Sequence, residues 1–175
     1  YNEDGVFNFT SEIENPIGVV TCTNNQYGEF LNNKLTVKNV SDNTTCTVKL
    51  VEEITTLYED GTLIINEQKG DREQNFKDHG KVSYSYDAMS SSNSYASSVP
   101  YEAEKEIITA VEIGKKIKPV SISSWFKELN SVEKADLSNV DTSSITSMYQ
   151  VFYEFGANQV SGGLQLDLKS WDVSK

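Results

Sequence analysis

The chain has 175 residues and a formal net charge of -11 at pH 7. This length allows one ordinary domain or two small ones, each with a hydrophobic core. Because affinity for a phosphate backbone depends on clustered Lys and Arg, the acidic balance argues against nucleic acid as a partner. It also opposes binding to anionic lipid surfaces. The sequence has no run of about 18 apolar residues, so it predicts no membrane-spanning segment.

Residues 1–50 contain short runs of alternating polar and apolar residues, separated by turn-forming residues. Such alternation predicts half-buried strands in an antiparallel sheet. Cys22 and Cys46 are the only cysteines. In a β-rich segment with many Ser, Thr and Asn residues they favour a disulfide formed in an oxidising compartment, which would staple a small β-module. The alternative is a pair of buried free thiols. One His and two widely spaced Cys give no zinc pattern, so no metal site is expected.

Residues 51–113 begin with a β-hairpin. The residues on both sides of Asp60-Gly61 are β-formers, and glycine takes a positive φ at a tight turn without strain. Residues 68–81 are polar and are expected to form an exposed loop. This loop contains His79, the only histidine, which is interpreted as a solvated loop residue and not as a catalytic base. Two further strands are expected, at 82–86 and 106–113.

Tyrosines gather around a serine-rich segment of low complexity at 90–98, which is expected to be a loop. Aromatic side chains beside a polar loop form a candidate contact surface for a carbohydrate or a protein. The candidate binding residues are Tyr84, Tyr86, Tyr95 and Tyr101. The alternative is that Tyr84 and Tyr86 only form one face of a strand.

Residues 114–175 contain a phrase that occurs twice. Ala135–Ser143 reads A-D-L-S-N-V-D-T-S, and Leu166–Ser174 reads L-D-L-K-S-W-D-V-S. Each copy follows an apolar residue and a phenylalanine, Trp125-Phe126 or Val151-Phe152. Self-similarity at a spacing of roughly 25–30 residues is typical of stacked repeats, in which one unit cannot bury its apolar face alone. The recurring Asp residues are expected to cap turns or helices through their side-chain oxygens.

Each repeat is expected to contain a helix followed by a strand. Apolar residues at helical spacing predict helices at 121–129 and from about 143 to 155. Strands are expected at 132–137 and 164–168. The expected repeat core residues are Trp125, Phe126, Leu137, Met148, Phe152 and Leu168. The predicted fold class is therefore α+β, with an N-terminal antiparallel β-rich part followed by a short leucine-rich-repeat-like helix/strand solenoid fragment.

The string A-D-L-S-N-V-D-T-S-S-I-T-S-M-Y-Q-V-F at 135–152 resembles the BspA-like leucine-rich-repeat surface proteins of bacteria. Their usual phrase is Leu-Asp-Leu-Ser-x-Phe/Trp-Asp-Thr-Ser-x-Val-Thr-x-Met-x-x-Met-Phe. The resemblance extends over about 54–175, with Ala135 in place of the first Leu and Val151 in place of the second Met. Residues 22–48 are similar to the small cysteine-bearing β-modules of Gram-positive surface proteins.

The resemblance implies an extracellular or cell-surface location and adhesion to a host extracellular protein or glycan. We therefore predict a secreted or surface-displayed bacterial adhesion or interaction module that is not an enzyme and uses no cofactor. One alternative is a structural spacer or pilus-like subunit whose partner is its own surface assembly. Another is a glycan-active enzyme that uses a pair of carboxylates. The sequence has no G-x-S-x-G, P-loop or G-x-G-x-x-G motif.

Overall fold

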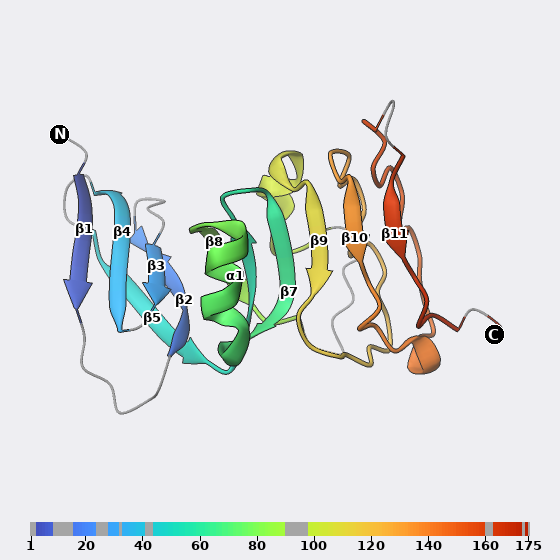
Figure 1. Ribbon diagram of the computed structural model, residues 1–175, viewed down its shortest axis with the longest axis horizontal. Coiled ribbons are helices and arrows are strands. Elements are labelled where there is room, and N and C mark those ends of the chain that lie inside the picture. Colours follow the sequence, from blue (N-terminus) through green and yellow to red (C-terminus); the bar gives the residue numbers. More distant parts are fainter. Residues whose placement is uncertain are drawn as a thin grey trace.

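A computed structural model describes residues 3–8, 16–23, 28–31, 33–40, 44–89, 98–159, 163–172 and 174. They form two β-sheets that lie end to end along the longest axis of the molecule (Figure 1). The first sheet comes from the N-terminal part of the chain. The second sheet takes strands both from 51–113 and from 114–175.

The first sheet has five strands in the order β1-β4-β3-β2-β5, and every neighbouring pair is antiparallel. Its strands are β1 (Glu3–Asn8), β2 (Ile17–Cys22), β3 (Gly28–Leu31), β4 (Lys34–Val40) and β5 (Cys46–Val51). Phe30, Leu35 and Val37 are buried on one face, where Val20 and Val48 pack against them. The alternation seen in the sequence therefore produces the expected antiparallel sheet.

Cys22 and Cys46 lie directly opposite each other on β2 and β5 and form a disulfide. The predicted disulfide is confirmed. Its Cα atoms are 4.0 Å apart, and the two cysteines are 24 positions apart in the sequence. Both side chains pack against the apolar cluster of the first sheet. The bond therefore closes a loop that contains β3 and β4 and ties β5 to the rest of the sheet.

Loss of the disulfide is expected to lower the free energy of unfolding of the first sheet by about 3 kcal/mol, because the unfolded chain regains loop entropy. Urea unfolding of the oxidised protein, the reduced protein and the Cys22→Ser/Cys46→Ser variant tests this expectation. The reduced protein and the variant should unfold at similar, lower urea concentrations. Identical midpoints for all three proteins would contradict a stabilising role.

The second sheet has six strands in the order β11-β10-β9-β7-β6-β8. Its strands are β6 (Glu53–Tyr58), β7 (Thr62–Gln68), β8 (Val82–Asp87), β9 (Ala110–Ile113), β10 (Lys134–Asp136) and β11 (Gln165–Asp167). β6 pairs antiparallel with β7 and β8, whereas β7, β9, β10 and β11 run parallel. The predicted hairpin joins β6 to β7, and Gly61 in its turn has a φ of 88°.

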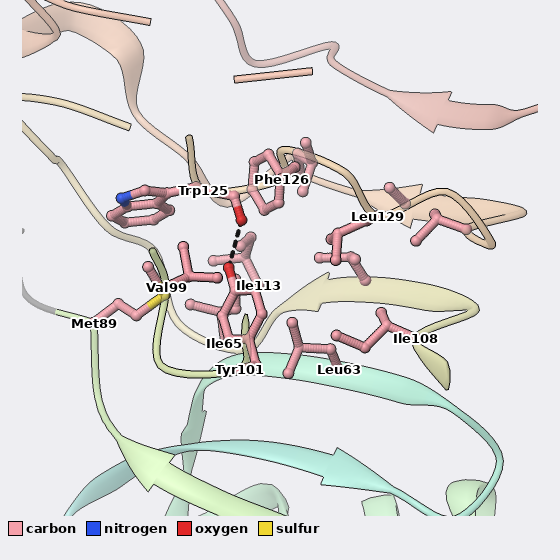
Figure 2. Close-up of a cluster of buried hydrophobic side chains, with 14 of the residues drawn as sticks. Leu63, Ile65, Met89, Val99, Tyr101, Ile108, Ile113, Trp125, Phe126 and Leu129 are labelled. Carbon is pink, nitrogen blue, oxygen red and sulfur yellow. Dashed lines mark hydrogen bonds between the residues drawn. The ribbon is translucent and has the colours of Figure 1, made fainter. Parts of the chain in front are cut away.

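The main core lies on one face of the second sheet, beneath the irregular segment at 122–132 (Figure 2). The strands contribute alternate residues to this face: Leu63, Ile65, Val111 and Ile113. Trp125 is completely buried among them. Its backbone oxygen accepts a hydrogen bond from the Tyr101 hydroxyl at 2.6 Å. Trp125, Phe126 and Leu137 are thus buried core residues, whereas Met148, Phe152 and Leu168 are half-buried and pack against the core.

The predicted helix/strand solenoid is wrong. Among the described residues the single α-helix is α1 (Arg72–His79), and it lies within 68–81, where a loop was expected. The segments expected to be helical, 121–129 and about 143–155, consist mainly of turns. Three short 3-10 helices complete the described elements: η2 (Lys69–Asp71), η3 (Glu102–Ile107) and η4 (Thr142–Ser144). The described chain is mostly β, so a two-sheet β fold replaces the α+β class.

Backbone conformation explains why the turn segments are not helical. Ser124 and Glu128 have positive φ angles of 59° and 61°, and so do Gln150 and Glu154, 26 positions later, with 53° and 55°. A left-handed residue ends an α-helix. Backbone groups instead bond to the neighbouring segment: the Ser124 and Glu128 N–H groups donate to the carbonyls 25 positions on, at 3.0 and 2.7 Å. Stacking therefore satisfies the groups that a helix would satisfy internally.

The repeated phrase corresponds to neighbouring strands. Ala135 of β10 lies opposite Leu166 of β11, and aromatic rings of the repeat region stack on one another as well. The Phe152 ring lies 5.8 Å from that of Phe126 and 5.7 Å from that of Trp171, measured between centroids. The sequence repeat thus corresponds to neighbouring parallel strands of one sheet, which are connected by turn segments.

Candidate functional site

The second sheet has an outer face, opposite the main core, that is only partly covered. Helix α1 packs over β6 and β7, where Phe76 contacts the buried side chains of Tyr58, Ile64 and Val82. No described element lies in front of β9, β10 and β11 in Figure 1. Parallel strands are usually covered on both faces. We call the outer face of these three strands the open strip.

Two rows of side chains cross the open strip, because residues of parallel strands pair in register. The first row is Ala110, Lys134 and Gln165, and the second row is Glu112, Asp136 and Asp167. Neighbouring strands lie about 4.8 Å apart, so the second row places three carboxylates side by side. A shallow groove of about 370 Å³ follows β10 and β11.

Two lysines partly neutralise the carboxylate row. Lys134 Nζ lies 3.8 Å from Glu112 Oε1, and Lys169 Nζ lies 2.8 Å from Asp167 Oδ2. Exposed ion pairs of this kind contribute little to stability. A positively charged partner can therefore replace these lysines beside the carboxylates at low energetic cost.

The recurring aspartates cap turns, as the sequence predicted. Asp136 Oδ1 accepts a hydrogen bond from the Ser138 backbone N–H at 3.0 Å, and Asp167 Oδ1 accepts one from the Lys169 backbone N–H at 3.0 Å. Asp141 and Asp172 bond in the same way, to Ser143 and Ser174. Hydrogen bonds from the Lys169 side chain and backbone hold the pKa of Asp167 below its ordinary value. This end of the carboxylate row therefore stays charged in mild acid.

A buried ion pair joins β7 to α1, and the sequence did not predict it. Glu67 and Arg72 are 0% and 2% exposed, and Glu67 Oε2 accepts a hydrogen bond from the Arg72 guanidinium. Glu67 also accepts hydrogen bonds from the hydroxyls of Thr56 and Tyr58, and from the Asn75 amide at 2.9 Å. These five residues come from three elements, so no local sequence pattern could have revealed the network.

The network anchors the helix, and four of its five residues are buried; Asn75 is half-buried. Burial raises the pKa of Tyr58 far above its ordinary value, and the Glu67 carboxylate raises it further against the lowering effect of Arg72. Tyr58 therefore remains a hydrogen-bond donor at any physiological pH. The Arg72 guanidinium carbon also lies 5.8 and 5.7 Å from the ring centroids of Tyr58 and Phe76. Such contacts stabilise a buried cation, which gives this cluster a structural role.

His79 ends α1 and contacts the hairpin turn. Its Nδ1 lies 2.9 Å from Asp60 Oδ2, and its ring centroid lies 5.6 Å from that of Tyr58. Only 18% of its side chain is exposed, so the interpretation as a solvated loop residue is wrong. Burial acts to raise the pKa of Asp60, but hydrogen bonds from Thr62 and His79 outweigh this effect and hold the pKa below its ordinary value.

The Asp60→Asn variant is expected to be less stable than the wild type at pH 7 and less sensitive to acid. Because folding lowers the pKa of Asp60, its carboxylate stabilises the fold above its unfolded pKa of about 4. This stabilisation is lost as the pH falls through the lower, folded pKa. Urea unfolding between pH 3 and 7 checks the prediction, with Asp78→Asn on the exposed side of α1 as the control. Parallel pH profiles for wild type and Asp60→Asn would contradict it.

The tyrosines predicted to form one contact surface lie in different environments. Tyr101 is completely buried in the main core, and Tyr95 lies outside the described residues. Tyr84 and Tyr86 are half-buried on β8 and pack against the same core. The Tyr86 hydroxyl donates a hydrogen bond to Glu104 Oε2 at 2.7 Å. Tyr84 and Tyr86 also line a cleft between the two sheets.

Two tyrosines that were not singled out in the sequence are well exposed. Tyr149 and Tyr153, in the turns of the second repeat, are 64% and 47% exposed. Both immediately precede a residue with positive φ, Gln150 or Glu154. In the sequence they lie between the apolar positions that predicted a helix, and no sequence pattern marked them as surface residues. Their exposure became visible only in the structure.

No protein-family model, curated protein or solved structure matches the chain. Within the described ranges, no helix combines the length and apolar character needed to cross a bilayer. Over the same ranges, no three or more His, Cys, Asp or Glu side chains gather in a group that could hold a metal ion. The functional argument therefore rests on the geometry of the open strip and of the cleft.

Proposed function

We propose that this chain is a bacterial cell-surface or secreted adhesion module that acts by binding and not by catalysis. The observation that carries the proposal is the open strip, a face of parallel strands that no described element covers. A sheet face of this kind is normally covered, and here its charged side chains form ordered rows. The disulfide supports an extracellular location, because disulfides persist in oxidising compartments.

The partner expected at the open strip is a host extracellular protein or glycan that presents positive charge or hydrogen-bond donors to the carboxylate row. Charged rows of this kind increase the rate of encounter and fix the orientation of a partner. The turn-capping bonds of Asp136 and Asp167 hold the two carboxylates in place before binding. Such preorganisation lowers the entropic cost of association.

Neutralising the carboxylate row is expected to weaken binding at least about tenfold, which corresponds to about 1.4 kcal/mol. The test variant is Glu112→Gln/Asp136→Asn/Asp167→Asn, because an Asn oxygen can still cap the turns. The control variant, Asp71→Asn/Glu73→Gln/Asp78→Asn, removes the same number of charges on and beside α1. Wild type and both variants are applied to arrayed extracellular matrix proteins, mucins and glycans.

A saturable signal that only the strip variant loses would support the proposal. Equal loss in both variants would mean that only overall charge matters, and binding that survives both would assign the contact to another face. No saturable signal on any array would contradict adhesion to host molecules.

A structural subunit is the second candidate, and the edge strand β11 favours it. β11 is the last strand of the sheet and pairs only with β10 among the described strands. An unpaired strand edge is a template for another strand, and the nearby Leu166, Leu168 and Trp171 are half-buried. Concentration-dependent self-association in analytical ultracentrifugation, without binding to any array, would favour this candidate.

A further inference from the structure

A cleft of about 280 Å³ lies between the two sheets, on the side of the molecule formed by β8 and η3. The first sheet supplies one wall, and β8 together with Pro100 and η3 supplies the other. Its lining residues include Val20, Thr21, Cys22, Tyr84, Tyr86 and Glu104. The cleft is separate from the open strip, which lies on the outer face of β9, β10 and β11.

The lining of the cleft is electronegative. Among its described lining residues, Glu104 is the one with a charged side chain, and none is Lys or Arg. Tyr84 and Tyr86 add two aromatic rings, whose faces carry negative charge density. Val20 and the disulfide-bonded Cys22 contribute an apolar part of the wall.

Contacts within the lining hold the aromatic and acidic groups in place. Glu104 Oε2 accepts the hydrogen bond from the Tyr86 hydroxyl at 2.7 Å. The Tyr86 ring packs edge-on against the buried Tyr101 ring, with 6.2 Å between centroids. Tyr84 and Tyr86 also pack against the main core. A site whose groups are fixed before binding loses little conformational entropy when a ligand enters.

We propose that this cleft binds a small organic cation that carries a quaternary ammonium group, such as choline or a trimethylated lysine side chain. Aromatic rings and a carboxylate around an apolar cavity are the chemistry that recognises such a group. A quaternary ammonium has no hydrogen to donate, so it is recognised through aromatic rings and a nearby counter-charge. Two tyrosines and a carboxylate line this cleft. The net charge of -11 also concentrates cations around the protein.

A matched pair of ligands separates charge from shape. Choline and 3,3-dimethyl-1-butanol differ in that a neutral carbon replaces the cationic nitrogen. Isothermal titration calorimetry and NMR of the tyrosine rings are used to titrate each ligand up to about 50 mM. Saturable choline binding, at least about tenfold tighter than binding of the neutral analogue, is expected.

Two variants locate the binding site. Glu104→Gln removes the counter-charge and is expected to weaken choline binding about tenfold. Glu106→Gln, on the exposed side of η3, is the matched control and should bind like the wild type. Tyr84→Leu removes one ring and should also weaken binding. Because Tyr84 lies at the edge of the core, the binding result for Tyr84→Leu counts only if the circular dichroism spectrum and urea midpoint of this variant match the wild type. If they do not match, Glu104→Gln alone decides whether choline binds in the cleft.

Three results would overturn the proposal: no saturable choline response, equal affinity for the two matched ligands, or unchanged affinity in Glu104→Gln. A response to methyl glycosides in place of choline would also overturn it and would make the cleft a sugar site. The affinities for choline, trimethyllysine and lysine are then compared. Tighter binding of choline indicates a free or lipid-headgroup quaternary ammonium, and tighter binding of trimethyllysine indicates a modified side chain. Failure here leaves the proposed adhesion function intact, since the open strip is tested by different variants.

Discussion

The Trp125→Ala variant is expected to lose about 3–5 kcal/mol of unfolding free energy, the largest single-residue effect in the main core. Trp125 is completely buried, and its ring packs edge-on against that of Phe126 with 6.4 Å between centroids. Truncation would leave a large cavity between the turn segment and the sheet (Figure 2). The cavity could close only if the segment at 122–132 moved towards β7 and β9.

Urea unfolding, followed by circular dichroism, measures the loss. Tyr149→Ala is the matched control, because it removes a large aromatic side chain that is 64% exposed. It should change stability by less than about 0.5 kcal/mol. A loss of under about 1 kcal/mol for Trp125→Ala would mean that this tryptophan does not organise the core.

The Glu67→Ala variant is expected to lose a similar amount, about 3–5 kcal/mol, because it leaves the buried Arg72 cation without its counter-charge. The hydroxyls of Thr56 and Tyr58 would lose their acceptor as well. Helix α1 should then detach from the sheet. Hydrogen exchange of its backbone amides should accelerate more than that of β9 and β10.

A double-mutant cycle tests whether the two charges act as a pair. The variant Glu67→Leu/Arg72→Met replaces the pair with apolar side chains and should be more stable than either Glu67→Leu or Arg72→Met alone. Additive losses in the double variant would contradict the coupling. The exposed pair formed by Lys77 and Glu73, 3.1 Å apart, provides a control cycle with a coupling of under about 0.5 kcal/mol.

Several features of the candidate sites were visible in the sequence and others were not. The recurring aspartates were recognisable as turn caps, because Asp followed by Ser or Lys two positions later is a local arrangement. The cleft was not, because its lining comes from β2, β8 and η3, which are distant in the chain. The sequence assigned Tyr101 to a contact surface, but Tyr101 is buried in the main core, where its hydroxyl donates a hydrogen bond to the backbone oxygen of Trp125. This contact joins residues 24 positions apart, so the sequence could not reveal it.

By itself, the sequence determined three features: the turn of the hairpin, the pairing of the two cysteines and the presence of stacked units. The turn at Asp60-Gly61 needs only a glycine between two β-forming runs, and the disulfide had one possible partner for each cysteine. The repeated phrase likewise indicated units that pack on one another, and Ala135 does lie opposite Leu166.

Only the tertiary structure decided where the helix lies. The apolar stripe of the second repeat was interpreted as helical, but stacking on the neighbouring segment satisfies its backbone groups and buries its side chains without a helix. The polar segment at 68–81 has no such stripe, and its helix is held by the buried pair of Glu67 and Arg72 and by Phe76. Long-range hydrogen bonds and burial thus outweighed local periodicity, because bonds to a neighbouring segment can satisfy the same backbone groups and a buried ion pair can hold a polar helix in place.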